Sequence, residues 1–163
     1  MNPLLLPFVG ADGSLTAWHS GDEPLAPGLL RPFLHVGSER QARSRAGRVL
    51  TRLTIAVADA RRLLDKAEQD WNPRRLRRLA ASGIGYGVYL NRHEGVDLDE
   101  VERARRDPRT RRAGRSIDGV PDRLFRSLVP SAGDSLIVVD PKLVLACETI
   151  SDRRGGGAGR GCA

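Results

Sequence analysis

The chain has 163 residues and a formal net charge of +7, from 27 basic and 20 acidic residues. This length fits one domain with a core of its own and is short for two domains of ordinary size. The two cysteines exclude a disulfide framework, and no apolar run approaches the length of a membrane span. We therefore expect a cytoplasmic protein that has no contact with membranes.

Arginine dominates the basic residues, because Lys66 and Lys142 are the only lysines. The planar guanidinium group favours phosphate and carboxylate, which indicates an anionic partner such as a nucleic acid or a phosphorylated cofactor. A GC-rich genome that encodes arginine at exposed positions explains the same composition without any partner.

The predicted elements begin after an irregular lead-in over residues 1–30, which is rich in proline and holds one weak strand signal at 14–19. Residues 33–36 form the first convincing strand. Ser38 to Gln41 then has the pattern of a capping box, which predicts a helix to about residue 46. The β-branched residues of 49–58 predict a central strand. A short helical turn is expected over 59–64, followed by a loop over 65–71.

The second half opens with a helix that begins at Asn72 and Pro73 and ends at Gly83, with Leu76, Leu79 and Ala80 on its buried side. A strand follows over 86–90. We then expect a helix from 97, an exposed basic loop over 103–115, a short helix over 121–128 and the last strand over 135–139. Residues 151–163, rich in glycine and arginine, are expected to be a disordered tail. Strands and helices mix without a regular βαβ rhythm, so the sequence predicts a single α+β domain.

Hydrogen-bonding and charged side chains gather directly after the 86–90 strand, in the run Asn-Arg-His-Glu-Gly of residues 91–95. No apolar spacing requires them at this point. Polar residues at the end of a rigid strand are typical of a functional site.

Four segments carry a resemblance to a known family. They are Phe-Leu-His-Val-Gly-Ser at 33–38, the segment 65–71, Gly-Val-Tyr-Leu-Asn-Arg-His-Glu-Gly at 87–95 and Asp-Ser-Leu-Ile-Val-Val-Asp-Pro at 134–141. Their order and content resemble the ADP-ribosyltransferase-like domains found in phage and mobile-element polyvalent proteins. The resemblance covers about residues 31–146. It implies a small split antiparallel sheet with flanking helices over 31–150, interrupted by a basic helical insert at about 96–133.

The resemblance implies an NAD-dependent mono-ADP-ribosyltransferase, an effector in the host cytoplasm that uses NAD+ as co-substrate, needs no metal and modifies a protein or a nucleic acid. Cleavage of the nicotinamide–ribose bond passes through an oxocarbenium-like state, which a nearby carboxylate stabilises. Glu94 is the expected carboxylate and Asp134 is the alternative. His35 is expected to bind ribose, Tyr89 to stack on nicotinamide, and Asn91 to bind the carboxamide or orient Glu94. The implied cofactor-binding set is His35, Gly37, Ser38, Tyr86, Tyr89 and Asn91.

Other interpretations stay open at this point. His35 also fits a core-edge histidine paired with a backbone carbonyl, at least one of Tyr86 and Tyr89 fits the core, and Glu94 fits a surface pair with Arg92. The same fold also fits a catalytically inactive interaction module or a basic nucleic-acid-binding module. The arginines expected to contact nucleic acid are Arg74, Arg75, Arg77, Arg78, Arg109, Arg111 and Arg112.

Overall fold

Two β-sheets form the body of the protein in the computed structural model, which describes residues 1–45, 47–63, 72–112 and 117–150. The first sheet is antiparallel and has the order β1-β3-β7, with β1 at Leu15–Gly21, β3 at Val49–Ile55 and β7 at Val144–Ile150. The second has the order β2-β6-β5-β4, with β2 at Leu34–Val36, β6 at Asp134–Val138, β5 at Tyr86–Leu90 and β4 at Ala60–Arg62. Among the strand pairs of the described residues, β4–β5 alone is parallel.

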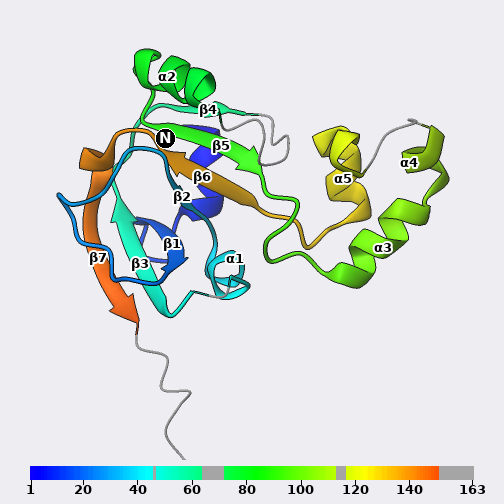
Figure 1. The fold of residues 1–163 in the computed structure, drawn as a ribbon, viewed down its shortest axis with the longest axis horizontal. Coiled ribbons are helices and arrows are strands. Elements are labelled where there is room, and N and C mark those ends of the chain that lie inside the picture. Colours follow the sequence, from blue (N-terminus) through cyan, green and yellow to red (C-terminus); the bar gives the residue numbers. More distant parts are fainter. Residues whose placement is uncertain (46, 64–71, 113–116, 151–163) are drawn as a thin grey trace, which may run out of the picture.

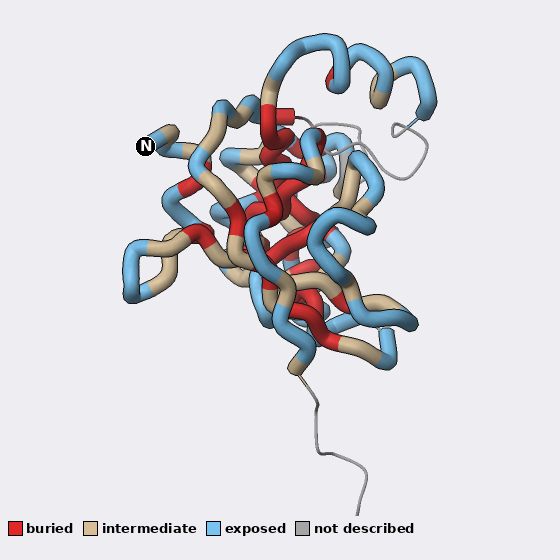
Figure 2. Tube along the Cα trace, turned by 90° about the vertical axis from the view of Figure 1, so that its left-hand side faces the viewer, coloured by how far each residue is buried: buried red, intermediate tan, exposed pale blue. Residues whose placement is uncertain are grey.

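The main core lies between the two sheets. Leu53 of β3, Val88 of β5 and Leu136 of β6 are all fully buried there. Figure 2 shows buried residues along the interior strands and exposed residues in the loops around them. Strand alternation sends Tyr86 and Val88 into this core, whereas Tyr89 packs on the opposite face of the second sheet. The sheets meet where β1 and β2 approach, through a bridge between Trp18 and Gly37.

The helices flank this sheet body and extend it to one side (Figure 1). They are α1 at Glu39–Arg43, α2 at Pro73–Ala81, α3 at Leu98–Arg106, α4 at Pro108–Arg112 and α5 at Asp122–Leu128. Short 3-10 helices lie at Pro3–Phe8, Ile117–Gly119 and Pro141–Leu143. Leu79 of α2 packs on the outer face of the second sheet, in the same cluster as Tyr89. None of the helices in the described ranges is both long and apolar enough to cross a membrane.

The segment between β5 and β6 forms a helical lobe, α3 to α5, with a small core of its own around Phe125 and Val120. Arg92 holds this core together, and its charged side chain is only 4 % exposed. Its guanidinium group donates to the carbonyl oxygens of Ile117 at 3.1 Å and Val120 at 2.7 Å and to Asp122 at 2.7 Å, and it lies 4.6 Å from the Phe125 ring centre. Arg92 therefore has a structural role and makes no surface pair with Glu94.

The structure confirms the α+β class, and the ADP-ribosyltransferase-like fold stays a prediction. Local signals were reliable where a cap decides the start of a helix. The Ser38–Gln41 capping box is formed, and Asn72 accepts a hydrogen bond from the backbone N–H of Arg75. In α2, however, Ala80 is exposed and only Leu79 is buried.

Several predicted elements were wrong because distant pairing overrides local preference. The lead-in over residues 1–30 belongs to the body, since Leu5 and Phe8 lie in the main core. The strand signal at 14–19 within it is confirmed by β1, which pairs with β3. The expected turn over 59–64 contains β4, and the expected basic loop contains the end of α3 and all of α4. The strand at 135–139 is not the last, because β7 follows it. The predicted loop at 65–71 and tail at 151–163 lie outside the described residues.

Candidate functional site

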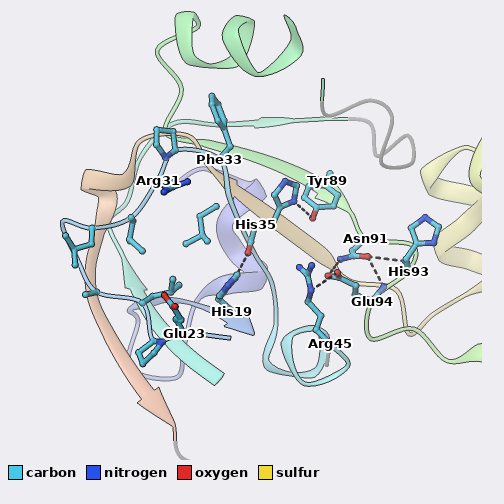
Figure 3. Close-up of a pocket in the computed structure, with 17 residues that line it drawn as sticks. His19, Glu23, Arg31, Phe33, His35, Arg45, Tyr89, Asn91, His93 and Glu94 are labelled. Carbon is cyan, nitrogen blue, oxygen red and sulfur yellow. Dashed lines mark hydrogen bonds and ion pairs between the residues drawn. The ribbon is translucent and has the colours of Figure 1, made fainter. Parts of the chain in front are cut away.

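A cleft of about 1230 Å³ opens beside the edge strand β2 (Figure 3). One side is the loop of residues 23–33, which contributes apolar residues such as Leu25, Leu30 and Phe33. The other side is polar and comes from β1, β2, the end of α1 and the end of β5. This volume is above the range of about 300–1,000 Å³ that is typical of small-molecule pockets, which leaves room for a cofactor-sized ligand.

His35 and Tyr89 form a contact pair in this cleft. A hydrogen bond of 3.0 Å joins His35 Nδ1 to the Tyr89 hydroxyl, and the two rings meet edge to face with their centres 5.8 Å apart. Burial lowers the pKa of His35 below the ordinary 6.5, so the imidazole is neutral at pH 7. A neutral ring with a fixed partner is suited to hydrogen bonding with an uncharged polar group, such as a sugar hydroxyl.

Glu94 is held at the polar end of the cleft by Asn91. The Asn91 amide nitrogen donates to Glu94 Oε2 at 2.9 Å and to the Ser135 hydroxyl at 3.1 Å. Its carbonyl oxygen accepts from the backbone N–H groups of His93 and Glu94. Because both ends of the buried Asn91 amide are engaged, the geometry fits the role of orienting Glu94 and does not fit binding of a carboxamide.

Arg45 supplies a positive charge next to this carboxylate. Its Nε lies 3.3 Å from Glu94 Oε1, and the two side chains are 45 % and 32 % exposed. The backbone N–H of Gly95 donates to the Ser44 hydroxyl at 2.9 Å. The end of α1 is thus fastened to the turn after β5, which places Arg45 beside Glu94.

His19 of β1 supports the arrangement from the first sheet. Its Nδ1 donates to the backbone oxygen of His35 at 3.1 Å, since a carbonyl can only accept. Burial lowers the pKa of His19 as well, and the Glu94 and Arg45 charges act on it in opposite directions. This bond helps to fix the edge strand that carries His35.

The cleft therefore brings together four of the predicted site residues, His35, Tyr89, Asn91 and Glu94. They come from β2, from β5 and from the turn after it. Figure 3 shows their side chains at the same end of the cleft, with Arg45 and His19 beside them.

The remaining predicted cofactor-binding residues do not fit that role. Ser38 caps α1 and does not line the cleft, and Gly37 uses its N–H and C=O in the bridge to Trp18. A Cβ atom at Gly37 would lie 2.4 Å from Gln41 Oε1, so the α-carbon of Gly37 packs closely against the Gln41 side chain. Tyr86 is fully buried in the main core and donates its hydroxyl to the carbonyl oxygen of Ala56, while burial raises its pKa.

Asp134 was wrong as the alternative catalytic carboxylate. Its side chain is 5 % exposed and is not part of the cleft lining. Arg62 binds both of its oxygens, at 2.6 and 3.1 Å, and Arg126 also donates to it. A carboxylate paired with two guanidinium groups is an anchor between the sheet and α5, and it is not available for an oxocarbenium-like substrate.

The predicted nucleic-acid arginines lie in two separate places. One group is on α2, where Arg74, Arg77 and Arg78 are exposed and Arg75 is partly buried. The other is on α4, at the far end of the helical lobe from α2 (Figure 1). There Arg109 is paired with Asp107 and Arg111 is exposed. The side chain of Arg112 lies outside the described part. The two groups do not form one continuous basic surface.

Among the polar residues beside His35 and Glu94, sequence reasoning missed His19 and Arg45. His19 lies at the end of the weak strand signal at 14–19, where no motif points to a site, and Arg45 is one of many arginines in the chain. For His19 the sequence offers one signal: a polar residue on the apolar face of a predicted strand, two positions before Gly21. Nothing in the sequence distinguishes Arg45 from the exposed arginines around it.

Within the described residues, no group of three or more histidine, cysteine or acidic side chains is arranged to hold a metal ion. No protein-family model, curated protein or solved structure matches the chain.

Proposed function

We propose that the cleft binds NAD+ and that the protein is a mono-ADP-ribosyltransferase acting on a protein or nucleic-acid acceptor. One observation carries the proposal: His35 of β2 lines a single cleft with Tyr89 and Glu94, although β2 is far in the sequence from β5 and the turn after it. The cleft also joins an apolar side to a polar side, which suits a ligand that has both flat rings and hydroxyl or phosphate groups.

Glu94 is the residue that acts on the reacting centre. When the bond between nicotinamide and ribose breaks, positive charge develops on the ribose ring, and a fixed carboxylate stabilises that charge more than it stabilises the ground state. The hydrogen bond of 2.9 Å from Asn91 supports this role because it orients the carboxylate before the substrate binds.

His35 and Tyr89 account for binding. The neutral His35 imidazole is suited to a ribose hydroxyl. The Tyr89 ring is buried in the cluster with Leu79 and offers no open face for stacking, so Tyr89 contributes through its hydroxyl, which holds His35 in place. Their mutual hydrogen bond holds both side chains in one rotamer, so less conformational entropy is lost when the substrate binds.

The test combines binding with turnover. We expect calorimetry to show heat on titration with NAD+, and chromatography to show slow release of nicotinamide. Glu94→Gln should bind NAD+ but lose turnover by about 10²- to 10⁴-fold, the range typical of a positioned acid–base or electrostatic group. The matched control is Glu39→Gln, because Glu39 pairs with Arg43 on the surface outside the cleft. Neither heat nor nicotinamide from the wild-type protein would refute the proposal.

A second candidate function is nucleic-acid binding through α2, which presents Arg74, Arg77 and Arg78 to solvent and has no acidic residue in its first turn. Binding through arginine–phosphate contacts weakens steeply as salt rises. A gel shift whose affinity stays the same when the salt concentration rises from about 50 mM to about 200 mM would exclude this function.

A further inference from the structure

The ion pair between Arg45 and Glu94 has a geometry that a ligand can exchange. The closest atoms of the two side chains are Arg45 Nε and Glu94 Oε1, and their distance of 3.3 Å is longer than the about 2.7–2.9 Å of strong charge-assisted hydrogen bonds. Both side chains keep about a third or more of their surface exposed. Exposed pairs of this kind contribute only about 0–1 kcal/mol.

The surrounding contacts nevertheless fix where Arg45 stands. The Gly95–Ser44 hydrogen bond ties the residue after Glu94 to the residue before Arg45. Gln41 of α1 donates to the carbonyl oxygen of Gly133 at 3.1 Å, which fastens the same helix to the start of β6. The backbone of Arg45 is therefore anchored while its side chain lines the open cleft.

In the free protein, Arg45 opposes the chemistry that Glu94 is proposed to perform. A guanidinium group 3.3 Å from the carboxylate offsets the negative field that would stabilise an oxocarbenium-like ribose. A phosphate group in the cleft would be a stronger partner for arginine than the carboxylate of Glu94, because phosphate offers more oxygen acceptors and a bidentate geometry.

We propose that Arg45 is the diphosphate-binding residue of the cleft, and that its pair with Glu94 is an autoinhibitory contact which a nucleoside diphosphate group exchanges. Binding of the diphosphate moves the guanidinium group from Glu94 to the phosphate oxygens and leaves the carboxylate free to face the ribose. This inference rests on the proposed function for its catalytic meaning, but the exchange itself is a binding property that does not require turnover.

The test uses ADP as the probe, with adenosine as the comparison ligand, in calorimetric titrations of the whole chain. We expect ADP to bind the wild-type protein more tightly than adenosine. Arg45→Gln should weaken ADP binding by about ten- to a hundredfold, as the loss of charge-assisted hydrogen bonds to phosphate predicts, and should leave adenosine binding unchanged. The matched control is Arg31→Gln, which removes another exposed cation of the same cleft.

The exchange predicts a second effect, which charge attraction between Arg45 and phosphate alone does not predict. Glu94→Gln releases Arg45 from its partner, so ADP should bind this variant about two- to fivefold more tightly than the wild type. In the double variant with Arg45→Gln, this gain should disappear, because there is no guanidinium group left to release. A gain that persists in the double variant would come from lost repulsion between Glu94 and phosphate, and would overturn the exchange.

The outcomes also separate this inference from the proposed function. ADP binding that depends on Arg45, together with an absence of nicotinamide release, would support the phosphate site and refute the transferase. The opposite outcome is nicotinamide release together with ADP binding that Arg45→Gln does not change, or that only Arg31→Gln weakens. It would overturn the assignment of Arg45 and leave the transferase proposal intact.

Discussion

Replacing Arg92 by methionine should unfold the helical lobe while the sheet body stays folded. The buried guanidinium group makes hydrogen bonds of 3.1, 2.7 and 2.7 Å to two carbonyl oxygens and to Asp122, and it lies over Phe125. Each hydrogen bond from a charged donor is worth about 1.5–3 kcal/mol, but the Asp122 side chain is 26 % exposed and regains part of its hydration when the arginine is lost. We therefore expect a loss of about 3–5 kcal/mol, as found when one partner of a buried ion pair is removed.

Hydrogen exchange by mass spectrometry measures this effect region by region. Peptides from α3 and α5 should lose protection in Arg92→Met, while peptides from β3 and β6 keep theirs. The matched control is Arg105→Met, because Arg105 is 55 % exposed and makes only a surface pair with Glu102. A change of less than about 1 kcal/mol for Arg92→Met in urea unfolding, with protection of the lobe unchanged, would refute the role given to Arg92.

Two further predictions concern Asp134 and the histidines. Asp134→Asn should lower the free energy of unfolding in urea by about 1–3 kcal/mol, because it breaks the pairing with Arg62 and Arg126. Nicotinamide release per folded molecule should stay at the wild-type rate. A loss of turnover as large as that of Glu94→Gln would contradict the structural role of Asp134. The free energy of unfolding should also fall as the pH drops below about 6.5: burial lowers the pKa of both His19 and His35, so the unfolded chain takes up protons at a higher pH than the folded one. The contribution of the two neutral histidines to stability is fully present above about pH 6.5. Denaturant titrations from about pH 7.5 to about pH 5 should therefore show a shallower decline of the unfolding free energy in His35→Asn than in the wild type. An identical decline would contradict the lowered pKa of His35.

The parts of the fold that the sequence predicts are those decided by neighbours along the chain. Ser38 and Asn72 each cap a helix within four residues, and the alternation of residues 86–90 is enough to define β5 and the opposite faces of its two tyrosines. The parts that it does not predict depend on distant partners. β4 is a strand because it pairs with β5, and β7 is a largely exposed edge strand that pairs with β3 and lacks a clear apolar pattern.

The site shows the same division. His35, Tyr89 and Glu94 were predicted because the residues around them form recognisable short motifs, and the structure brings them to one cleft. The error with Asp134 has a physical cause, since its two arginine partners lie 72 and 8 residues away and cannot be inferred from local spacing. Arg45 was missed for the same reason, because only the folded chain places it beside Glu94.

His35, Tyr89 and Glu94 should line the site of one NAD+ molecule. A crystal structure of Glu94→Gln grown with NAD+ would show this, since this variant should hold the substrate without cleaving it. We expect the ribose next to nicotinamide within hydrogen-bonding distance of His35, and the diphosphate on Arg45. A cleft without bound ligand at saturating NAD+, or NAD+ bound at a different surface, would contradict it.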